Sequence, residues 1–178
     1  MLTGSGLQSV FETALLLHSV YGVPYLLGPT VRGSLRAALA AGFPSQADLL
    51  FGKDPQPSGA AATESTSGYI TVFDALWVPG SAPTPLALDV LTVHHPYYYK
   101  SSPPNRVEAP TDFDQPTPVH FLTGRGKFLF ALVAPDDKWR DYLNKLLPQA
   151  LRFRGIGAKT SAGYGRFLLP IPPKASAS

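Results

Sequence analysis

The hydrophobic pattern of the chain predicts an α+β fold in which strands and helices alternate. Apolar residues recur at helical spacing over residues 29–43 and 135–153, and runs typical of strands lie before, between and after these two stretches. This is the β-α-β-β-α-β order of ferredoxin-like folds, with hairpins and loops inserted. RNA-recognition domains share this topology and use an open sheet face. We therefore predict one domain over residues 1–171 and a flexible tail over residues 172–178.

The N-terminal part predicts a strand followed by a helix. Residues 9–22 contain an apolar run that the turn at Gly22 ends. Pro29 suits the first turn of the helix that follows, and Pro44 helps to close that helix. Gly33 inside the helix costs about 1 kcal/mol relative to alanine. A close neighbour such as an RNA backbone would explain this glycine, and so would tight helix packing.

The middle of the chain predicts two strands between two loops. Residues 52–67 are rich in Pro, Ser, Ala and Gly and are typical of a loop. Residues 68–80 alternate as a strand, and residues 85–95 form another. Residues 101–118 hold five prolines and are expected to be extended loop.

The C-terminal part predicts a hairpin, the second helix and a last strand. The hairpin covers residues 119–135 and turns at residues 124–126. Asp136 can cap the second helix, and Pro148 should kink or shorten it. A short strand is expected over residues 165–171.

Composition and charge limit the class of protein. The 178 residues are enough for one domain, and the absence of cysteine excludes disulfides and thiolate metal sites. Without a long apolar run, we expect neither secretion nor a membrane span, and a cytoplasmic location fits. Residues 121–178 hold ten Lys and Arg against three Asp and Glu, a net +7, whereas residues 1–120 have five against nine, a net −4. The basic part suggests a polyanionic partner, and a solvated surface helix with a basic tail is the alternative.

A glycine-rich segment, "RFRGIGAKTSAGYGRF", occupies residues 152–167. It is not a Walker loop, because Ala158 stands where the second glycine belongs and the segment follows a helix instead of preceding one. It is not a dinucleotide-binding fingerprint, because Thr160 replaces the third glycine. An NTPase or a dehydrogenase is therefore not expected.

The remaining chemistry of this segment is that of a phosphate and ribose contact. A flexible backbone offers N–H groups, and Lys159, Thr160 and Ser161 add a cation and two hydroxyls. A tight turn with glycines at positive φ is the alternative. Four glycines in eleven residues, with arginines beside them, favour RNA contact.

Other residues are weaker candidates for chemistry. His18 could be a general acid or base, although a lone histidine is more often structural. Asp89, His94 and His95 could suggest a metal, but adjacent histidines on an extended segment point to opposite faces, so we predict no metal and no cofactor. The run Tyr97, Tyr98, Tyr99 could stack on bases, contact another subunit, or lie in the core.

The segment "GIGAKTSAGYGRF" resembles the C-terminal glycine-rich signature of the RAMP superfamily of CRISPR proteins. Four further segments agree in order with one type of subunit, the backbone-capping subunit of the type III-B (Cmr) effector near the 3′ end of the guide RNA. They are residues 9–40, "LFGKD" followed by "GYITVFDALW", "DVLTVHHPYYY", and "PTPVHFLTGRGKFLFAL". The resemblance runs from about Thr3 to about Leu168. It departs at Pro29-Thr30-Val31, which replaces a G-S-S pattern, and in a short N-terminus.

The resemblance implies a non-catalytic subunit that binds the guide crRNA in a type III-B CRISPR RNA-targeting effector complex of antiviral defence. The implied partners are other RAMP subunits in a hetero-oligomer, target RNA only indirectly, and no membrane. Related target-cleaving subunits carry an Asp soon after the first strand, whereas Glu12 is the sole acid here between Val10 and Arg36. The alternative is a metal-independent endoribonuclease that processes CRISPR repeat RNA through His18.

The resemblance and the residues together define one set of predicted RNA-binding positions, on the first helix, near the end of the first strand and in the glycine segment. They are His18, Tyr21, Thr30, Arg32, Arg36, Arg154, Gly155, Gly157, Lys159, Thr160, Ser161, Gly163, Tyr164, Gly165 and Arg166.

Overall fold

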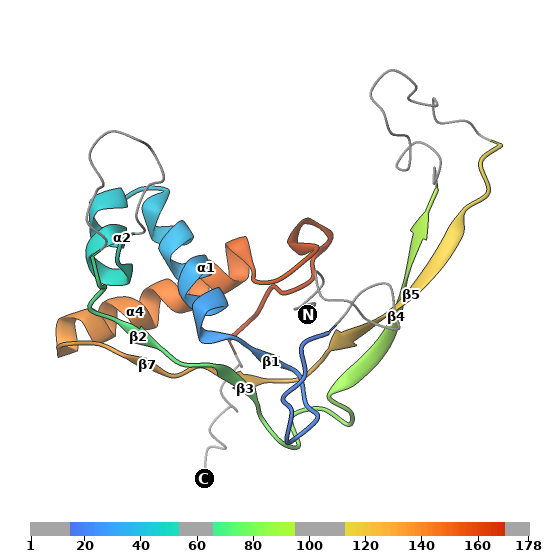
Figure 1. Ribbon diagram of the computed structural model, residues 1–178, viewed down its shortest axis with the longest axis horizontal. Helices are drawn as coiled ribbons and strands as arrows, with labels where there is room; N and C mark the ends of the chain where they lie inside the picture. The colour runs from blue at the N-terminus through green and yellow to red at the C-terminus, as the bar shows by residue number, and fades with distance from the viewer. Residues whose placement is uncertain (1–14, 54–65, 95–112, 170–178) are drawn as a thin grey trace, which may run out of the picture.

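The computed structural model describes residues 15–53, 66–94 and 113–169, which form helices and small antiparallel sheets. Figure 1 shows the helices gathered over the short strands, while the two longest strands, β4 and β5, run away from them as a separate ribbon. The predicted mixture of helices and sheets is confirmed. The ferredoxin-like order stays a prediction, because residues 9–14 of the expected first strand, residues 9–22, lie outside the described residues and the rest forms only a turn with an isolated bridge.

Helix α1 (Gly28–Ala40) forms where the helical spacing predicts it. Its buried face includes Val31, Leu35 and Leu39, which belong to the main hydrophobic core. Its N-terminus is closed by a residue distant in sequence, since the Gly28 N–H donates a hydrogen bond of 2.6 Å to the Asp74 carboxylate. The helix therefore begins against the strand region that contains Asp74.

Helix α2 (Pro44–Phe51) was not expected from the sequence. Helix α1 ends at Ala40, ahead of Pro44, and Pro44 instead occupies the first turn of α2, where its missing N–H would have no helical acceptor. The helix buries Ala47, Leu50 and Phe51 against α1. Its eight residues are too short for periodicity to distinguish them from a loop.

The single strand predicted over residues 68–80 is wrong, because two short strands in different sheets replace it. Strand β2 (Thr71–Val72) pairs with β7 (Leu132–Val133), and β3 (Ala75–Trp77) lies between β1 (Tyr25–Leu26) and β6 (Phe128–Leu129). The break falls where Asp74 caps α1. The pairing is interrupted only locally, because the Phe73 N–H still donates to the Ala131 carbonyl at 3.1 Å, while the chain advances four positions from Val72 to Leu76 and its partner three from Leu132 to Leu129. A Cβ on Gly28 would lie 2.5 Å from the Val72 carbonyl oxygen, so α1 begins in close contact with this segment.

The hairpin predicted over residues 119–135 is also wrong. Strand β5 (Thr117–Gly124) pairs along its whole length with β4 (Leu86–Val93), from Leu86↔Gly124 to Val93↔Thr117, whereas β6 and β7 pair with β3 and β2. The turn at residues 124–126 is held by the chain that connects β3 to β4. The Arg125 N–H donates to the Pro85 carbonyl at 2.9 Å, and the Trp77 indole N–H donates to the Arg125 carbonyl at 2.7 Å.

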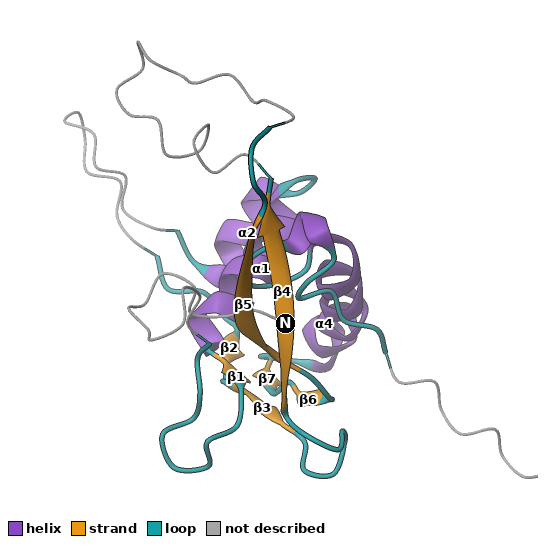
Figure 2. Cartoon of the chain, turned by 90° about the vertical axis from the view of Figure 1, so that its right-hand side faces the viewer, coloured by secondary structure: helices purple, strands orange, loops and turns teal. Residues whose placement is uncertain are grey.

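Figure 2 shows the ribbon of β4 and β5 facing the viewer, with the short strands near its lower end. The predicted strand over residues 85–95 is confirmed as β4, with bounds Leu86–Val93. The predicted loops over residues 52–67 and 101–118 lie largely outside the described residues, as do Tyr97, Tyr98, Tyr99 and His95.

Helix α4 (Asp137–Gln149) confirms the second predicted helix and its cap, since the Asp136 carboxylate accepts the Trp139 N–H at 2.9 Å. After Pro148 the α-helical register ends at Gln149, and the chain continues as a π-helix over Ala150–Arg154. A proline has no N–H for the α-helical ladder, so a change of register near it is expected.

The strand predicted over residues 165–171 is wrong for the described part, residues 165–169, which pairs with no strand there. This segment packs instead beside the π-helix, with the Phe167 N–H donating to the Leu151 carbonyl at 3.1 Å. Within the described ranges, no helix is long and apolar enough to cross a bilayer.

Candidate nucleic-acid interface

The segment from Gly155 to Arg166, called the glycine loop below, follows the π-helix and turns back on itself (Figure 1). Its backbone takes positive φ at five positions, and a side chain is present at one of them, Lys159, with φ 58°. Lys159 is the sole non-glycine residue at positive φ in the described part of the chain. The other four positions are Gly155, Gly157, Gly163 and Gly165. The alternative offered above, a tight turn with glycines at positive φ, therefore explains why these four residues are glycines.

Two of the glycines are required for closure of the loop. The Ile156 N–H donates to the Gly165 carbonyl at 2.9 Å, and a Cβ on Gly165 would collide with the Ile156 carbonyl oxygen. A Cβ on Gly155 would lie 3.0 Å from the Thr160 methyl group. Gly163 differs, because a Cβ there would meet no described atom within 4 Å.

The tip of the glycine loop presents a row of free backbone donors. The N–H groups of Ala162, Gly163 and Tyr164 bond to carbonyls of Lys159 and Thr160 within the loop. The N–H groups of residues 157–161 donate to no acceptor among the described residues. These five consecutive residues are exposed or half-buried, so water or an anion can reach this part of the backbone.

Three cationic residues lie within or next to the glycine loop in the sequence, Arg154, Lys159 and Arg166. Arg154 and Arg166 are exposed and Lys159 is half-buried. The Arg166 Nε donates to the Thr160 carbonyl at 3.1 Å, which holds its side chain against the loop. None of the three forms an ion pair with a described carboxylate. Their charge is therefore available to an external anion.

Helix α1 contacts the start of the glycine loop. The Ser34 hydroxyl donates to the Gly155 carbonyl at 3.1 Å. The neighbouring Gly33 is exposed, and a Cβ there would meet no described atom within 4 Å. Packing among the described residues therefore does not require this glycine.

The predicted phosphate contacts of Arg32 and Arg36 compete with contacts inside the chain. Arg32 donates to the Phe51 carbonyl, and Arg36 donates to the Gly52 carbonyl at 3.2 Å. Arg36 also forms an ion pair of 2.6 Å with Asp48. Both arginines lie on one face of α1, as their spacing predicts, but this face meets the C-terminal end of α2. Thr30, by contrast, is exposed.

Tyr164 and Asp89 form a contact that the sequence did not reveal. The Tyr164 hydroxyl donates to the Asp89 carboxylate at 2.6 Å, and the Tyr164 ring meets the buried Phe121 ring edge-on at 5.7 Å. This hydrogen bond, helped by the Val90 N–H, holds the pKa of Asp89 below its ordinary value of 3.8. The same bond raises the pKa of Tyr164 above its ordinary value of 10.0. The contact joins the glycine loop to the ribbon of β4 and β5.

The described contacts of His18 and Tyr21 are local and do not include the glycine loop. The described end of the expected first strand is a turn between Leu17 and Pro24, which form an isolated bridge, and not a continuous strand. The His18 Nδ1 accepts the Val20 N–H at 3.3 Å, and its ring centre lies 4.7 Å from that of Tyr21. Within the described chain, neither side chain hydrogen-bonds to the loop.

The metal candidate is not assembled in the described residues. They contain no group of three His, Cys, Asp or Glu side chains that could hold an ion. Asp89 is engaged by Tyr164, and His95 lies outside the described ranges.

Three comparisons with known proteins bear on this geometry. A family model described as RAMP superfamily matches residues 1–167. The CRISPR system Cmr subunit Cmr6 of Pyrococcus furiosus is 29% identical over 220 aligned positions, which cover 94% of this chain and 64% of that relative. The chain thus spans less than two thirds of the length of this relative. A chain in the cryo-EM structure of the type III-B Cmr-beta bound to cognate target RNA is similar in fold, with a TM-score of 0.70 and 22% identity over 96% of this chain and 54% of the other.

Proposed function

The chain belongs to the RAMP superfamily, and from this premise we propose that it is a non-catalytic, guide-RNA-binding subunit of a type III-B CRISPR effector complex in the cytoplasm. The similarity to a Cmr subunit and to a chain of an RNA-bound Cmr assembly supports this proposal. Its partners would be the guide crRNA and neighbouring RAMP subunits, with target RNA contacted indirectly. A place at the end of the backbone near the guide 3′ end, and a ferredoxin-like arrangement of the elements, belong to the same proposal.

The observation that carries the proposal is the row of N–H groups over residues 157–161 that donate to no acceptor among the described residues. Consecutive backbone donors at positive-φ turns form concave sites for phosphate oxygens. Lys159, Arg154 and Arg166 lie in or next to this loop in the sequence and form no ion pair with a described carboxylate. Phosphates carry no sequence information, so such a loop holds a guide of any sequence.

Helix α1 supports this site from the side. The Ser34 hydroxyl holds the start of the loop, and the open surface at Gly33 lets an RNA backbone pass close to the helix. Arg32 and Arg36 act mainly by fixing α1 to α2, since their guanidinium groups bond to the end of α2.

The non-catalytic part of the proposal rests on the surroundings of His18. The partners of His18 in its described hydrogen bonds are all backbone groups. The Val20 backbone N–H donates to the His18 ring, and the His18 backbone N–H donates to the Val23 carbonyl. Its ring neighbours are Tyr21 and Tyr25. No second acid or base hydrogen-bonds to it in the described chain to share proton transfer.

The test is to tag the protein in its host, purify it gently and sequence the RNA that accompanies it. We expect short RNAs with a uniform 5′ repeat tag, together with other RAMP subunits. Lys159→Glu should reduce the retained RNA and lower the salt slope of binding by about one unit or more. Lys145→Glu is the matched control, because Lys145 is exposed on α4, outside the loop, and the charge change is the same.

Two results would contradict the proposal. Unchanged RNA retention and salt slope in Lys159→Glu would remove the loop from the RNA path. Cleavage of repeat RNA by the isolated protein, abolished by His18→Ala, would replace the binding role with the endoribonuclease alternative.

A further inference from the structure

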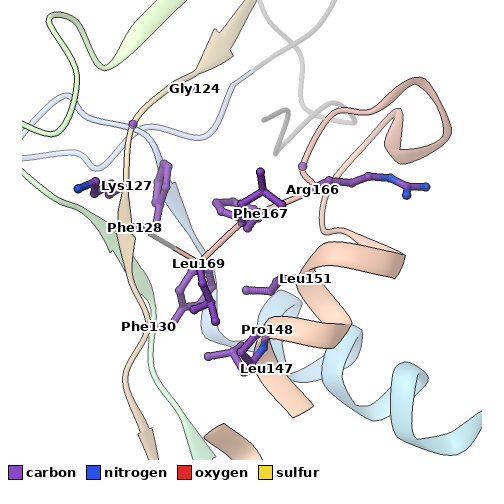
Figure 3. Close-up of a pocket in the computed structure, with 13 residues that line it drawn as sticks. Gly124, Lys127, Phe128, Phe130, Leu147, Pro148, Leu151, Arg166, Phe167 and Leu169 are labelled. Carbon is purple, nitrogen blue, oxygen red and sulfur yellow. The ribbon is translucent and has the colours of Figure 1, made fainter. Parts of the chain in front are cut away.

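A cavity of about 510 Å³ lies directly beside the glycine loop (Figure 3). Gly165 and Arg166 belong both to the loop and to the cavity wall. The opposite wall comes from the chain around β6, and the floor comes from the end of α4 and the π-helix. The volume lies within the range typical of small-ligand sites, roughly 300 to 1,000 Å³.

Three phenylalanines form the centre of the wall. The Phe167 ring meets Phe128 and Phe130 edge-on, with both pairs of ring centres 5.7 Å apart. All three side chains are half-buried, so part of their aromatic surface borders the cavity. Leu151 and Pro148 face them across the space in Figure 3. Such a surface suits a flat, apolar-faced partner better than a charged one.

The charges at the cavity are all of one sign. Lys127 and Arg166 are exposed lining residues, and Figure 3 shows their side chains on opposite sides of the phenylalanine cluster. No carboxylate is among the described residues that line the space. An occupant therefore combines an apolar planar part inside with negative charge outside.

We propose that this cavity accepts one unstacked nucleobase of a single-stranded RNA, with Lys127 and Arg166 next to the adjoining phosphates. The inference rests on the proposed function and deepens it. The Arg166 Nε bonds to the Thr160 carbonyl, so the cavity edge is tied directly to the row of free N–H groups. An RNA backbone that follows the loop therefore places a base at the cavity mouth. Stacking on phenylalanine accepts any base, because every base has a π-face.

The experiment is photocrosslinking of the full-length protein to a single-stranded RNA of roughly 10 nucleotides that carries 5-iodouridine at each position in turn. Mass spectrometry then locates the crosslinked peptide. We expect a crosslink to Phe128, Phe130 or Phe167 from one or a few neighbouring positions. Because this reading uses the unmodified chain, it does not depend on a variant that folds.

A variant pair gives the affinity. Phe130→Leu keeps an apolar side chain of similar volume but removes the aromatic face, and we expect RNA binding roughly 5- to 150-fold weaker, the range for loss of one base stack. Phe43→Leu is the control, since Phe43 is exposed at the start of α2 and lines no part of the cavity. Equal loss in both variants would overturn the inference.

The outcomes separate this inference from the function on which it rests. Salt-sensitive RNA binding that Lys159→Glu weakens, with crosslinks only outside the three phenylalanines, would overturn the base site and leave the proposed function standing. RNA binding that is insensitive to Lys159→Glu would contradict both the base site and the proposed RNA-binding role of the glycine loop. In the purified complex, a photoreactive benzoylphenylalanine at Leu168, which lines the cavity, should crosslink to RNA. A crosslink to a neighbouring protein subunit instead would assign the cavity to a protein contact.

Discussion

The first turns of α1 and the glycine loop are adjacent regions with similar residues, a glycine-containing backbone with hydroxyls and cations. In α1, the Gly28 N–H donates a hydrogen bond to Asp74. Arg32 donates to the Phe51 carbonyl at the end of α2, and Arg36 forms an ion pair with Asp48 of α2. In the glycine loop, the N–H groups over residues 157–161 and the nearby cations have no described internal acceptor or ion pair. The two regions therefore differ in unused hydrogen-bonding capacity and not in residue type, and this difference is why we propose the anion site for the loop and not for α1.

The largest expected effect tests the part of the loop that is purely structural. Gly165→Ala should lower the free energy of unfolding by roughly 3 kcal/mol, because its Cβ collides with the Ile156 carbonyl at a positive φ. Gly163→Ala should lower the free energy of unfolding by only about 1 kcal/mol, because its positive φ strains the alanine backbone but the added Cβ meets no described atom within 4 Å. Urea denaturation of the two variants measures the difference. Similar values for both would mean that the loop does not close as described.

The next effect separates the two regions. Arg36→Ala should lower the free energy of unfolding by about 1 kcal/mol, because it removes the bonds to Gly52 and Asp48 at a half-buried site. The salt slope of RNA binding should stay unchanged, in contrast with Lys159→Glu. Thermal melting and binding titrations at several salt concentrations provide both values. A reduced salt slope in Arg36→Ala would restore this arginine to the RNA path.

Gly33→Ala sharpens the comparison within α1 itself. Alanine should stabilise the helix by up to about 1 kcal/mol, because the position is exposed and a Cβ meets no described atom within 4 Å. RNA retention should nevertheless fall, since the added methyl group occupies the surface that we assign to a passing RNA backbone. Melting temperature and co-purified RNA are the measurements. Increased stability with unchanged RNA would leave Gly33 without a role in binding.

The smallest effect concerns the contact between the loop and the ribbon of β4 and β5. The lowered pKa of Asp89 means that its bond to Tyr164 stabilises the fold above pH 3.8 and is lost as the pH falls through the lowered pKa. The raised pKa of Tyr164 means that the bond is present below pH 10.0 and is lost as the pH rises through the raised pKa. Tyr164→Phe should therefore melt slightly lower between these limits and match the unmodified protein in strong acid. An equal gap at every pH would show that the hydroxyl bond contributes nothing.

Local patterns predicted much of this fold. Helices α1 and α4, the Asp136 cap and strand β4 were all predicted, because periodicity, a capping side chain and an apolar run act over a few neighbouring residues. The glycine loop could be identified as a possible phosphate contact for the same reason. Its residues are close in sequence, and their positive-φ turns need no distant partner to be recognised.

The sequence by itself therefore determined where the main helices lie and which segment holds the glycines, hydroxyls and cations that we propose as a phosphate contact. Only the tertiary structure decided that β5 pairs with β4, that Asp74, between β2 and β3, caps α1, and that Arg32 and Arg36 hold α2. It also decided that Tyr164 binds Asp89 and that three phenylalanines surround a cavity beside the loop. The physical reason is that each of these choices joins donors, acceptors or apolar faces that are distant along the chain. Alternation and residue type say that such groups need partners, but only the packed chain determines which partner is within reach.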